Sequence, residues 1–331
     1  MAVTLPAVLA IDAGNSKTDV ALIAPDGSVT ATGRAGGFQP FLTGVAAAVD
    51  VLAEAMASVG LDYRGEGGTG PWAEYVSACL ANADFPVEER ELGHEIRRRG
   101  WGRVTAVHND TFALLRAGLP PGAEPRGVAV VCGAGINCVG TTPDGRTARF
   151  PAVGRISGDW GGGGGLAEEA LWFAARAEDG RGEPTELARA LPAHFGLTSM
   201  YALVQELHLG RVPAERRHEL TPLLFAVAAA GDPVALALVH RQADEVVTMA
   251  TVALRRLDLL DEEVPVVLGG SVLAARHPQL NDRIAAGLAE RAPRARISVV
   301  TAPPVLGAAL LGLDALGSAP FAHSKLRARF G

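Results

Sequence analysis

Residues 10–19 read Ala-Ile-Asp-Ala-Gly-Asn-Ser-Lys-Thr-Asp, and this stretch decides the fold. Together with Val8 and Leu9 it begins as an apolar run without helical period, which is typical of a strand covered on both faces. Asp12 ends the run with a carboxylate, and Gly14 lets the backbone turn before a second apolar run starts at Val20. The stretch therefore predicts a β-hairpin with a polar turn.

The turn offers the groups that a phosphate needs. Asn15, Ser16, Lys17 and Thr18 supply amide, hydroxyl and ammonium donors. Asp12 beside them can hold a metal ion through water. An ordinary hairpin turn uses the same residue types, so the interpretation depends on the rest of the chain.

The composition is that of a globular protein large enough for two lobes. The chain has 331 residues, of which 48% are hydrophobic and 20% charged, so it can bury a large core. A net charge of -6 argues against a nucleic-acid partner. The basic run Arg97 to Arg99 is expected at the C-terminal end of a helix, which favours positive charge. Gly, Pro or charged residues interrupt the long apolar stretches, so no membrane span is expected.

The cysteine content and the N-terminal residues favour a cytoplasmic protein. Cys79, Cys132 and Cys138 cannot all pair with one another, which fits a reducing compartment. Residues 1–6 carry no positive charge from Lys or Arg ahead of the apolar run, so we expect no signal peptide.

Apolar runs separated by turn residues predict alternating strands and helices. In the first part of the chain, we expect a hairpin over 9–29 that turns at Pro25-Asp26-Gly27, a third strand over 31–34, a helix over 45–58, helical or mixed segments over 75–81 and 86–99, a short strand over 104–107, and a helix over 111–117. Residues 119–127 are rich in Pro and Gly and predict a surface loop.

A second strand and glycine turn repeat the first. Residues 128–132 are an apolar run that leads into Gly133-Ala134-Gly135-Ile136-Asn137 and a hairpin with its own Pro-Asp-Gly turn at 143–145. A third turn, Gly269-Gly270-Ser271, follows a strand over 264–268 and opens a helix over 272–276, which lets a phosphate or a flat base approach the backbone. Two such hairpins imply related halves facing a cleft, with Asp110 at a strand end between them.

In this order, the motifs resemble those of the BadF/BadG/BcrA/BcrD-type ATPase and N-acetylglucosamine kinase group, in the sugar kinase, actin and Hsp70 superfamily. The resemblance rests on residues 12–18, Asn109-Asp110, residues 133–137, residues 154–159 and Gly269-Gly270-Ser271. It implies an α/β, duplicated ribonuclease-H-like (actin-like ATPase) fold with two lobes and a central cleft. The implied N-terminal lobe comprises residues 1–112 plus about 316–331, and the larger C-terminal lobe residues 113–315.

The resemblance also implies roles for single residues. ATP and Mg²⁺ are the implied cofactors, with Asp12 at the metal and the nucleotide bound by Gly14, Asn15, Ser16, Lys17, Thr18, Gly133, Ala134, Gly135, Gly269, Gly270 and Ser271. Asp110 becomes the general base that accepts the proton of a sugar hydroxyl as its oxygen attacks the γ-phosphate. As an alternative or additional role, Asp110 caps the helix that follows it.

The resemblance to a sugar kinase implies an acceptor site around residues 154–169. Ser157, Gly158 and Asp159 would place a carboxylate beside sugar hydroxyls, and Asn109 and Asn137 can donate and accept there. The five glycines of residues 161–165 cannot hold one conformation by themselves. We expect either that a ligand orders them or that they form a flexible linker.

The identity of the sugar depends on its 2-substituent. A free 2-amino group is cationic and favours carboxylates such as Glu168, although an acid in the first turn of a helix also favours the helix dipole. An N-acetyl group needs an apolar slot and an amide partner. Gln39 lies where N-acetylglucosamine kinases use a sugar-binding Asn, and residues 157–169 resemble actinobacterial glucosamine kinases. We expect phosphorylation of the 6-hydroxyl of glucosamine, with N-acetylglucosamine as the alternative.

Other classes of protein were weighed against this one. An ATPase that activates a dehydratase through an iron–sulfur cluster needs exposed paired cysteines, whereas Cys132 and Cys138 are predicted to be buried. A repressor needs a DNA-binding unit that residues 1–7 cannot form, and the eight histidines lack the spacing of a metallohydrolase. Residues 178–220 are expected to cover the site or to form a subunit contact, and the family suggests a homodimer.

Overall fold

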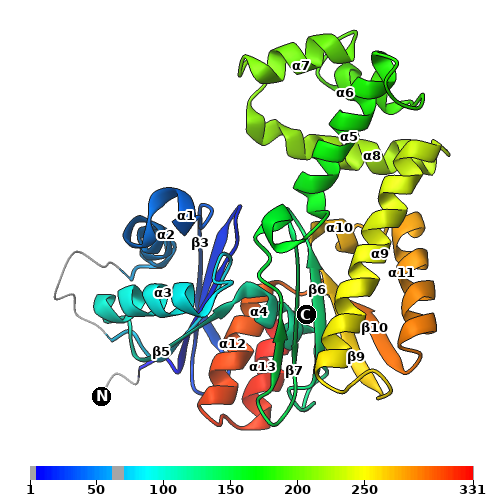
Figure 1. The fold of residues 1–331 in the computed structure, drawn as a ribbon. Helices are drawn as coiled ribbons and strands as arrows, with labels where there is room; N and C mark the ends of the chain where they lie inside the picture. The colour runs from blue at the N-terminus through cyan, green and yellow to red at the C-terminus, as the bar shows by residue number, and fades with distance from the viewer. Residues whose placement is uncertain (1–4, 62–70, 331) are drawn as a thin grey trace.

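Two five-stranded sheets carry the fold of the computed structural model, which describes residues 5–61 and 71–330 (Figure 1). The first sheet contains β1 (Val8–Ala13), β2 (Thr18–Ile23), β3 (Val29–Ala35), β4 (Ala73–Leu80) and β5 (Gly102–Asn109), in the order β3-β2-β1-β4-β5. The second contains β6 (Gly127–Cys132), β7 (Ile136–Thr141), β8 (Thr147–Arg149), β9 (Val264–Gly269) and β10 (Ala295–Val299), in the order β10-β9-β6-β7-β8.

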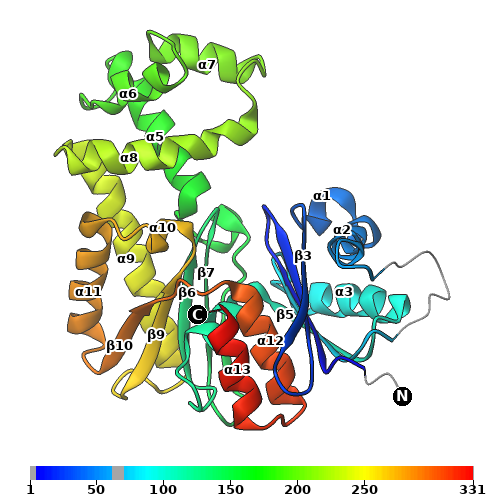
Figure 2. The ribbon, with the colours of Figure 1, turned by 180° about the vertical axis from the view of Figure 1, so that it is seen from behind.

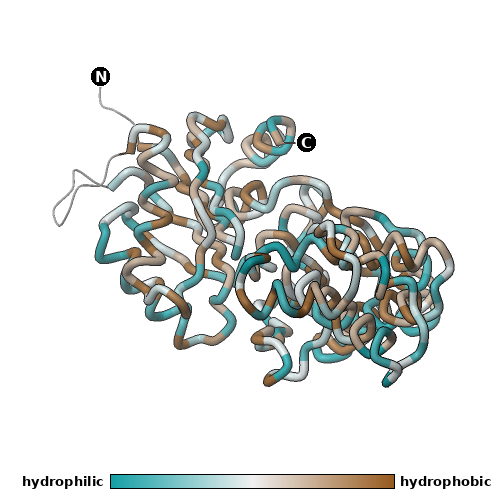
Figure 3. Tube along the Cα trace, turned by 90° about the horizontal axis from the view of Figure 1, so that it is seen from above, coloured by the Kyte–Doolittle hydropathy of each residue, from teal (hydrophilic) through white to brown (hydrophobic). Residues whose placement is uncertain are grey.

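The two sheets have the same topology. In the first, β1 pairs antiparallel with β2 and parallel with β4; in the second, β6 pairs antiparallel with β7 and parallel with β9. The last two strands of each sheet, β4 with β5 and β9 with β10, are parallel. This repeat confirms the duplicated α/β fold with two lobes, which lie side by side when seen from above (Figure 3).

Helices cover both faces of each sheet. On the first, α2 (Val45–Ala57) and α3 (Pro86–Arg99) pack against one face, and α4 (Asp110–Gly118), α12 (Pro304–Ala315) and α13 (Pro320–Phe330) against the other. Leu9 and Ile11 point to the first group and Val8 and Ala10 to the second, which explains why β1 is apolar at successive positions. Short α1 (Pro40–Thr43) precedes α2.

The second sheet packs on α4 through one face and on α9 (Pro233–Arg256) through the other. Its remaining helices are α10 (Ser271–Ala274) and α11 (Pro278–Arg291). Beyond it stands a helical extension formed by α5 (Gly162–Glu178), α6 (Leu187–His194), α7 (Met200–His208) and α8 (Leu220–Ala229), with 3₁₀ turns at Gly154–Ser157 and Ala214–Glu219 (Figure 2). Helix α4 therefore lies between the two sheets.

Two expectations from the sequence were wrong. Residues 75–81, expected to be helical or mixed, belong to strand β4, because β1 and β5 pair with it on both sides. The glycines of residues 161–165 form neither a linker nor a segment that waits for a ligand. Gly163 N donates to Gly133 O at 2.7 Å and Gly164 N donates to Ala134 O at 2.9 Å, so the second glycine turn orders the start of α5.

The C-terminal helices return to the first sheet. Helix α12 packs against β1 and β4, which places residues 304–315 with the first lobe as well. We therefore propose that the C-terminal part of the N-terminal lobe begins at Pro304 rather than near residue 316.

Within residues 5–61 and 71–330, no single helix is long and apolar enough to cross a membrane. The helical segments Ala214–Ala229 and Pro233–Arg256 are long and apolar enough only when they are taken together, and the chain bends by 111° between them.

Candidate active site

A cavity of about 310 Å³ lies where the carboxyl ends of the two sheets face each other. Twelve of the residues singled out in the sequence line it, namely Asp12, Gly14, Asn15, Ser16, Lys17, Asn109, Asp110, Gly133, Ala134, Gly135, Asn137 and Gly270. They come from the first glycine turn, the end of β5, the second glycine turn and the end of β9. Topology thus brings together side chains that are up to 258 residues apart in the chain.

The first glycine turn is closed by a hydrogen bond from Gly14 N to Lys17 O at 2.8 Å. Lys17 forms an ion pair of 2.9 Å with Asp19, and Asp19 also accepts from Arg34. The turn is held from outside by Asn82, whose Nδ2 donates to Asn15 Oδ1 at 2.9 Å. Ser16 remains exposed, so the turn keeps hydroxyl and ammonium donors at the cavity edge.

The second glycine turn presents bare backbone. Gly133 N donates to Gly135 O at 3.0 Å, and a Cβ added at either glycine would meet no atom within 4 Å. Gly270 has a φ of +87°, and a Cβ there would lie 2.5 Å from the carbonyl of Cys132. Only glycine fits at Gly270, which lets the end of β9 pack tightly beneath the open turn.

Two carboxylates share the floor of the cavity. The pKa of Asp12 is raised to about 8. Burial is the largest cause, and the charges of Asp110 and Asp19 also raise the pKa, whereas Lys17 lowers it. Burial likewise raises the pKa of Asp110 to about 6, although hydrogen bonds with Thr111 act in the opposite direction. A divalent cation would offset this desolvation, so the donor set fits Mg²⁺.

No group of three or more His, Cys, Asp and Glu residues in the described part of the chain is arranged to hold a metal ion. Mg²⁺ commonly takes one or two carboxylates and completes its shell with water and phosphate oxygens. Asp12 is therefore sufficient as the protein ligand for a metal that arrives with a nucleotide.

Asn109 and Asn137 join the two lobes above Asp110. Asn109 Nδ2 donates to Asp84 Oδ1 at 2.8 Å, and Asn137 Nδ2 donates to Asn109 Oδ1 at 3.2 Å. Asn109 Oδ1 also accepts from Thr111 N at 3.0 Å, so Asn109 is the N-cap of α4. The capping role considered for Asp110 belongs to Asn109, and Asp110 stands in the first helical turn.

Three polar residues that line the cavity were missed in the sequence: Asn82, Asp84 and Thr111. Asn82 and Asp84 follow β4, which was not recognised as a strand. Polar residues directly after an apolar segment also mark the ends of β1 and β5, and the same signal at Leu80 would have identified these two.

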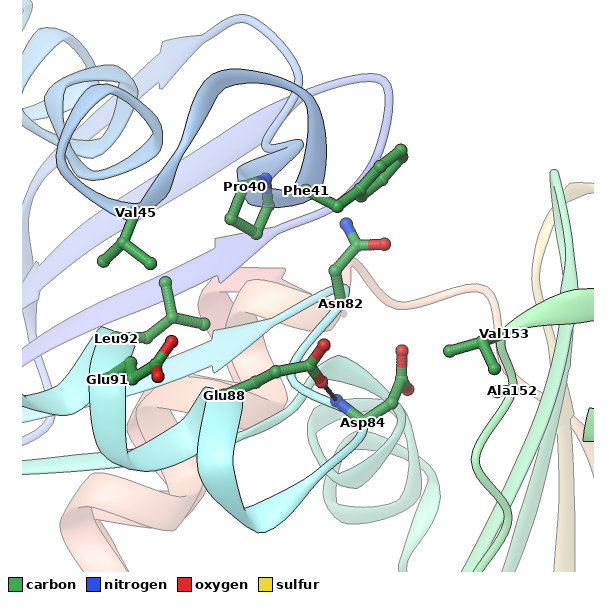
Figure 4. A pocket seen from close by; sticks show the side chains of 10 residues that line it. All are labelled: Pro40, Phe41, Val45, Asn82, Asp84, Glu88, Glu91, Leu92, Ala152 and Val153. Carbon is green, nitrogen blue, oxygen red and sulfur yellow. Dashed lines mark hydrogen bonds between the residues drawn. The ribbon is translucent and has the colours of Figure 1, made fainter.

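A second cavity of about 510 Å³ adjoins the first through the shared residues Asn82, Asp84 and Ala152 (Figure 4). Its other lining residues are Pro40, Phe41, Val45, Glu88, Glu91, Leu92 and Val153. Burial, together with the charges of Asp110 and Glu88, raises the pKa of Asp84 to about 7. This cavity is therefore mostly apolar with an acidic side, a combination that suits a compact polar molecule with a cationic group.

Eight residues singled out in the sequence do not line either cavity, namely Thr18, Gln39, Ser157, Gly158, Asp159, Glu168, Gly269 and Ser271. Thr18 is fully buried in β2. Gln39 Nε2 donates to Asn15 O at 3.1 Å, which supports the first turn from behind. Ser157 bonds with Asp159, and Glu168 lies with Glu169 and Trp172 at a separate hollow.

The three cysteines do not fit an iron–sulfur cluster. Cys79, Cys132 and Cys138 are free and buried. Burial raises the pKa of the Cys132 thiol to about 12 and also raises the pKa of the other two. Thiols that lie buried in strands are unsuited to a cluster that must bridge two subunits.

Comparison with known proteins gives relatives with this fold. An N-acetyl-D-glucosamine kinase of Dictyostelium discoideum is 27% identical over 211 residues, which are 63% of this chain and 65% of the relative. An N-acetylmuramic acid/N-acetylglucosamine kinase of Clostridium acetobutylicum is 27% identical over 213 residues, which are 63% of this chain and 69% of the relative. The chain thus matches slightly less than two thirds of the Dictyostelium protein.

Solved structures agree with the fold. A proposed N-acetylglucosamine kinase of Chromobacterium violaceum superposes with a TM-score of 0.67 at 24% identity, covering 93% of this chain and 99% of the other. A ROK family glucokinase of Streptomyces griseus, solved with glucose and AMPPNP, superposes with a TM-score of 0.57 at 16% identity, covering 92% of this chain and 98% of the other.

These likenesses establish the fold as that of the actin-like ATPases and sugar kinases. The family model for BadF/BadG/BcrA/BcrD ATPases matches residues 9–312, which include both glycine turns, Asp110 and the end of β9. The chain therefore belongs to the BadF/BadG/BcrA/BcrD ATPase family.

Proposed function

We propose that the protein is a sugar kinase that transfers the γ-phosphoryl group of ATP to the 6-hydroxyl of an amino sugar. One observation carries the proposal. Asp110 lies in a cavity lined by Asp12, by the glycine turns of both lobes and by the polar groups of Asp84, Asn109 and Asn137. The first two suit a metal-bound triphosphate, and the polar groups suit an acceptor with several hydroxyls.

In the proposed mechanism, the Asp110 carboxylate accepts a hydrogen bond from the acceptor hydroxyl and takes its proton as the oxygen attacks the γ-phosphorus. The N–H groups of Ala134 and Gly135 in the open second turn bind phosphate oxygens, while the Gly133 N–H closes the turn. Mg²⁺ bound beside Asp12 would neutralise charge on the β- and γ-phosphates. A pKa of about 6 leaves Asp110 mostly ionised at neutral pH and yet able to hold a proton.

Two acceptors are candidates. The carboxylates Asp84, Glu88 and Glu91 in the adjoining cavity favour glucosamine, whose 2-amino group is cationic. The names of the relatives favour N-acetylglucosamine, and the apolar residues Phe41, Leu92 and Val153 suit an acetyl group. We place glucosamine first because Asp84 lines both cavities and so lies at their junction.

A coupled ADP-release assay with Mg²⁺ and ATP, run on glucosamine, N-acetylglucosamine, mannosamine and glucose, tests the proposal. We expect sugar-dependent ADP release with glucosamine as the best acceptor, and phosphorus–proton coupling at C6 in the NMR spectrum of the product. Faster turnover of N-acetylglucosamine would select the second candidate. Comparable rates on glucose would show that the amino group is not recognised, and ADP release independent of any sugar would indicate an ATPase instead.

A further inference from the structure

Asp84 is a carboxylate with one oxygen occupied and one available. Asp84 Oδ1 accepts both amide donors, from Asn109 at 2.8 Å and from Asn137 at 3.4 Å. Its Oδ2 has no hydrogen-bond partner among the residues that the structure describes. A desolvated carboxylate oxygen of this kind favours a hydrogen-bond donor or a cation of a ligand.

The carboxylate of Asp84 lies at the junction of the two cavities. Asp84 lines both cavities, and in Figure 4 its carboxylate points into the space between Asn82 and Val153. Neither Lys nor Arg is among the residues that line the larger cavity. The guanidinium of Arg149 is close enough to lower the pKa of Asp84, but it donates to main-chain carbonyls and pairs with Glu89, so Oδ2 stays available to a positive group on a ligand.

The main chain of Asp84 is clamped from both lobes. Arg149, on β8 of the second sheet, donates through Nη2 to Ala83 O at 3.0 Å and to Asp84 O at 3.3 Å, while its Nη1 pairs with Glu89 at 2.9 Å. On the other side, Glu88 Oε2 accepts from Asp84 N at 2.9 Å. The direction of the carboxylate is thus set by the protein before any ligand binds.

We propose that Asp84 is a specificity residue that binds the acceptor sugar through Oδ2 and prefers a 2-ammonium group to a 2-acetamido group. The inference rests on the proposed kinase function, since it assigns a contact to the acceptor of that reaction. With its 6-hydroxyl at Asp110, a hexosamine directs the opposite end of its ring toward the cavity that Asp84 shares. In this arrangement Oδ1 accepts from Asn109 and Asn137, and Oδ2 binds the ligand.

The substitution Asp84→Asn tests this contact alone. The amide oxygen can still accept from Asn109 and Asn137, whereas the amide nitrogen replaces Oδ2 by a donor without charge. We expect the KM for glucosamine to rise about tenfold or more and the KM for ATP to stay within about twofold. The ratio of kcat/KM for glucosamine to that for N-acetylglucosamine should fall about tenfold.

Further substitutions distinguish a direct contact between Asp84 and the sugar from a general effect of negative charge in the cavity and from a defect in folding. Glu91→Gln removes a carboxylate from the same cavity and measures the effect of charge alone, so it should raise the glucosamine KM by a smaller factor of about three, because charge at a distance is weaker than a direct hydrogen bond. Arg149→Met should raise the sugar KM as Asp84→Asn does, and Arg149→Lys should restore part of the loss by keeping one donor to the carbonyls.

The outcomes distinguish the contact from the proposed function. If wild-type protein phosphorylates an amino sugar but Asp84→Asn leaves the sugar KM and the specificity ratio unchanged, the contact is wrong and the function stands. If Asp84→Asn raises the KM values of sugar and ATP equally, Asp84 has only a structural role, and the inference is again overturned. If wild-type protein phosphorylates none of the sugars, the proposed function fails, and with it the inference.

Discussion

The two sheets share one strand order but present different chemistry at the edge where they meet. In the first lobe, Asp12 is the second-last residue of β1, and β5 leads into Asp110. In the second lobe, Val131 is the second-last residue of β6, and β10 is followed by residues 300–303, which contain no carboxylate. One edge therefore carries charged side chains, and the other carries bare backbone.

The third pair of strand ends continues the contrast. Strand β4 leads to Asn82 and Asp84, whereas β9 leads to Gly270, which has no side chain. Carboxylates on both edges would face each other across the cavity, and each would raise the pKa of the others. We therefore propose that the first lobe supplies the side chains for a proton and a cation, and that the second supplies N–H groups for phosphate.

Among the substitutions that test this contrast, Asp110→Asn is expected to have the largest effect on turnover. We expect Asp110→Asn to lower kcat by about 10³-fold, since a positioned general base contributes about 10²- to 10⁴-fold. Steady-state ADP release with the best acceptor measures the loss. Asp144→Asn is the control, because Asp144 lies exposed on the turn after β7. Near-wild-type turnover by a folded Asp110→Asn protein would remove Asp110 from the mechanism.

On the backbone side, Gly270→Ala is expected to have the next largest effect. A Cβ there would lie 2.5 Å from the backbone of Cys132 and 2.8 Å from Gly133 N, at a φ of +87°. We expect a loss of about 3 kcal/mol in the free energy of unfolding, from strain and overpacking together, and a higher KM for ATP because the second glycine turn is displaced.

Gly145→Ala is a matched control for this change. Gly145 has a φ of +86°, but a Cβ there would meet no atom within 4 Å. Backbone strain alone should therefore lower the free energy of unfolding by about 1 kcal/mol and leave the ATP KM unchanged. Equal losses in the two variants, measured by urea unfolding, would show that the contact between the glycine segments does not matter.

The features that the sequence predicted correctly are those with local signals. The glycine turns at Gly14 and at Gly133 each follow a continuous apolar strand, so short stretches were sufficient to identify them. The strand ahead of Asp110 was found in the same way, although β5 runs from Gly102 to Asn109 instead of over 104–107. These residues account for much of the cavity and for the repeated topology.

The features that were missed depend on distant partners. Strand β4 reads Ala-Glu-Tyr-Val-Ser-Ala-Cys-Leu, a mixture without clear period, and it is a strand because β1 and β5 flank it. The mistake removed Asp84 from the candidate site. Similarly, Gly163 and Gly164 are ordered by a turn about thirty residues earlier, which no local pattern reports.

The smallest expected effect is a pH dependence of stability that originates in the charged edge. Burial raises the pKa of Asp12 to about 8 and that of Asp84 to about 7, whereas both are near 3.9 in an unfolded chain. Between pH 7 and 8.5 the folded state thus binds more protons than the unfolded state, so stability falls as pH rises. We expect these two carboxylates to lower the free energy of unfolding of the ligand-free protein by about 2 kcal/mol over this range.

Urea unfolding of wild-type protein and of Asp12→Asn at pH 7.0 and 8.5 measures this loss and its source. The amide does not titrate, so Asp12→Asn should remove the largest single part of the slope and Asp84→Asn a smaller part. The three buried thiols, which titrate at about 8.5 in an unfolded chain, add to the slope in every variant. His108 and His277, whose pKa values burial lowers, act in the opposite direction, but their effect lies mainly below pH 7. A slope that Asp12→Asn leaves unchanged would show that Asp12 does not titrate in this range and would weaken the contrast between the two lobes.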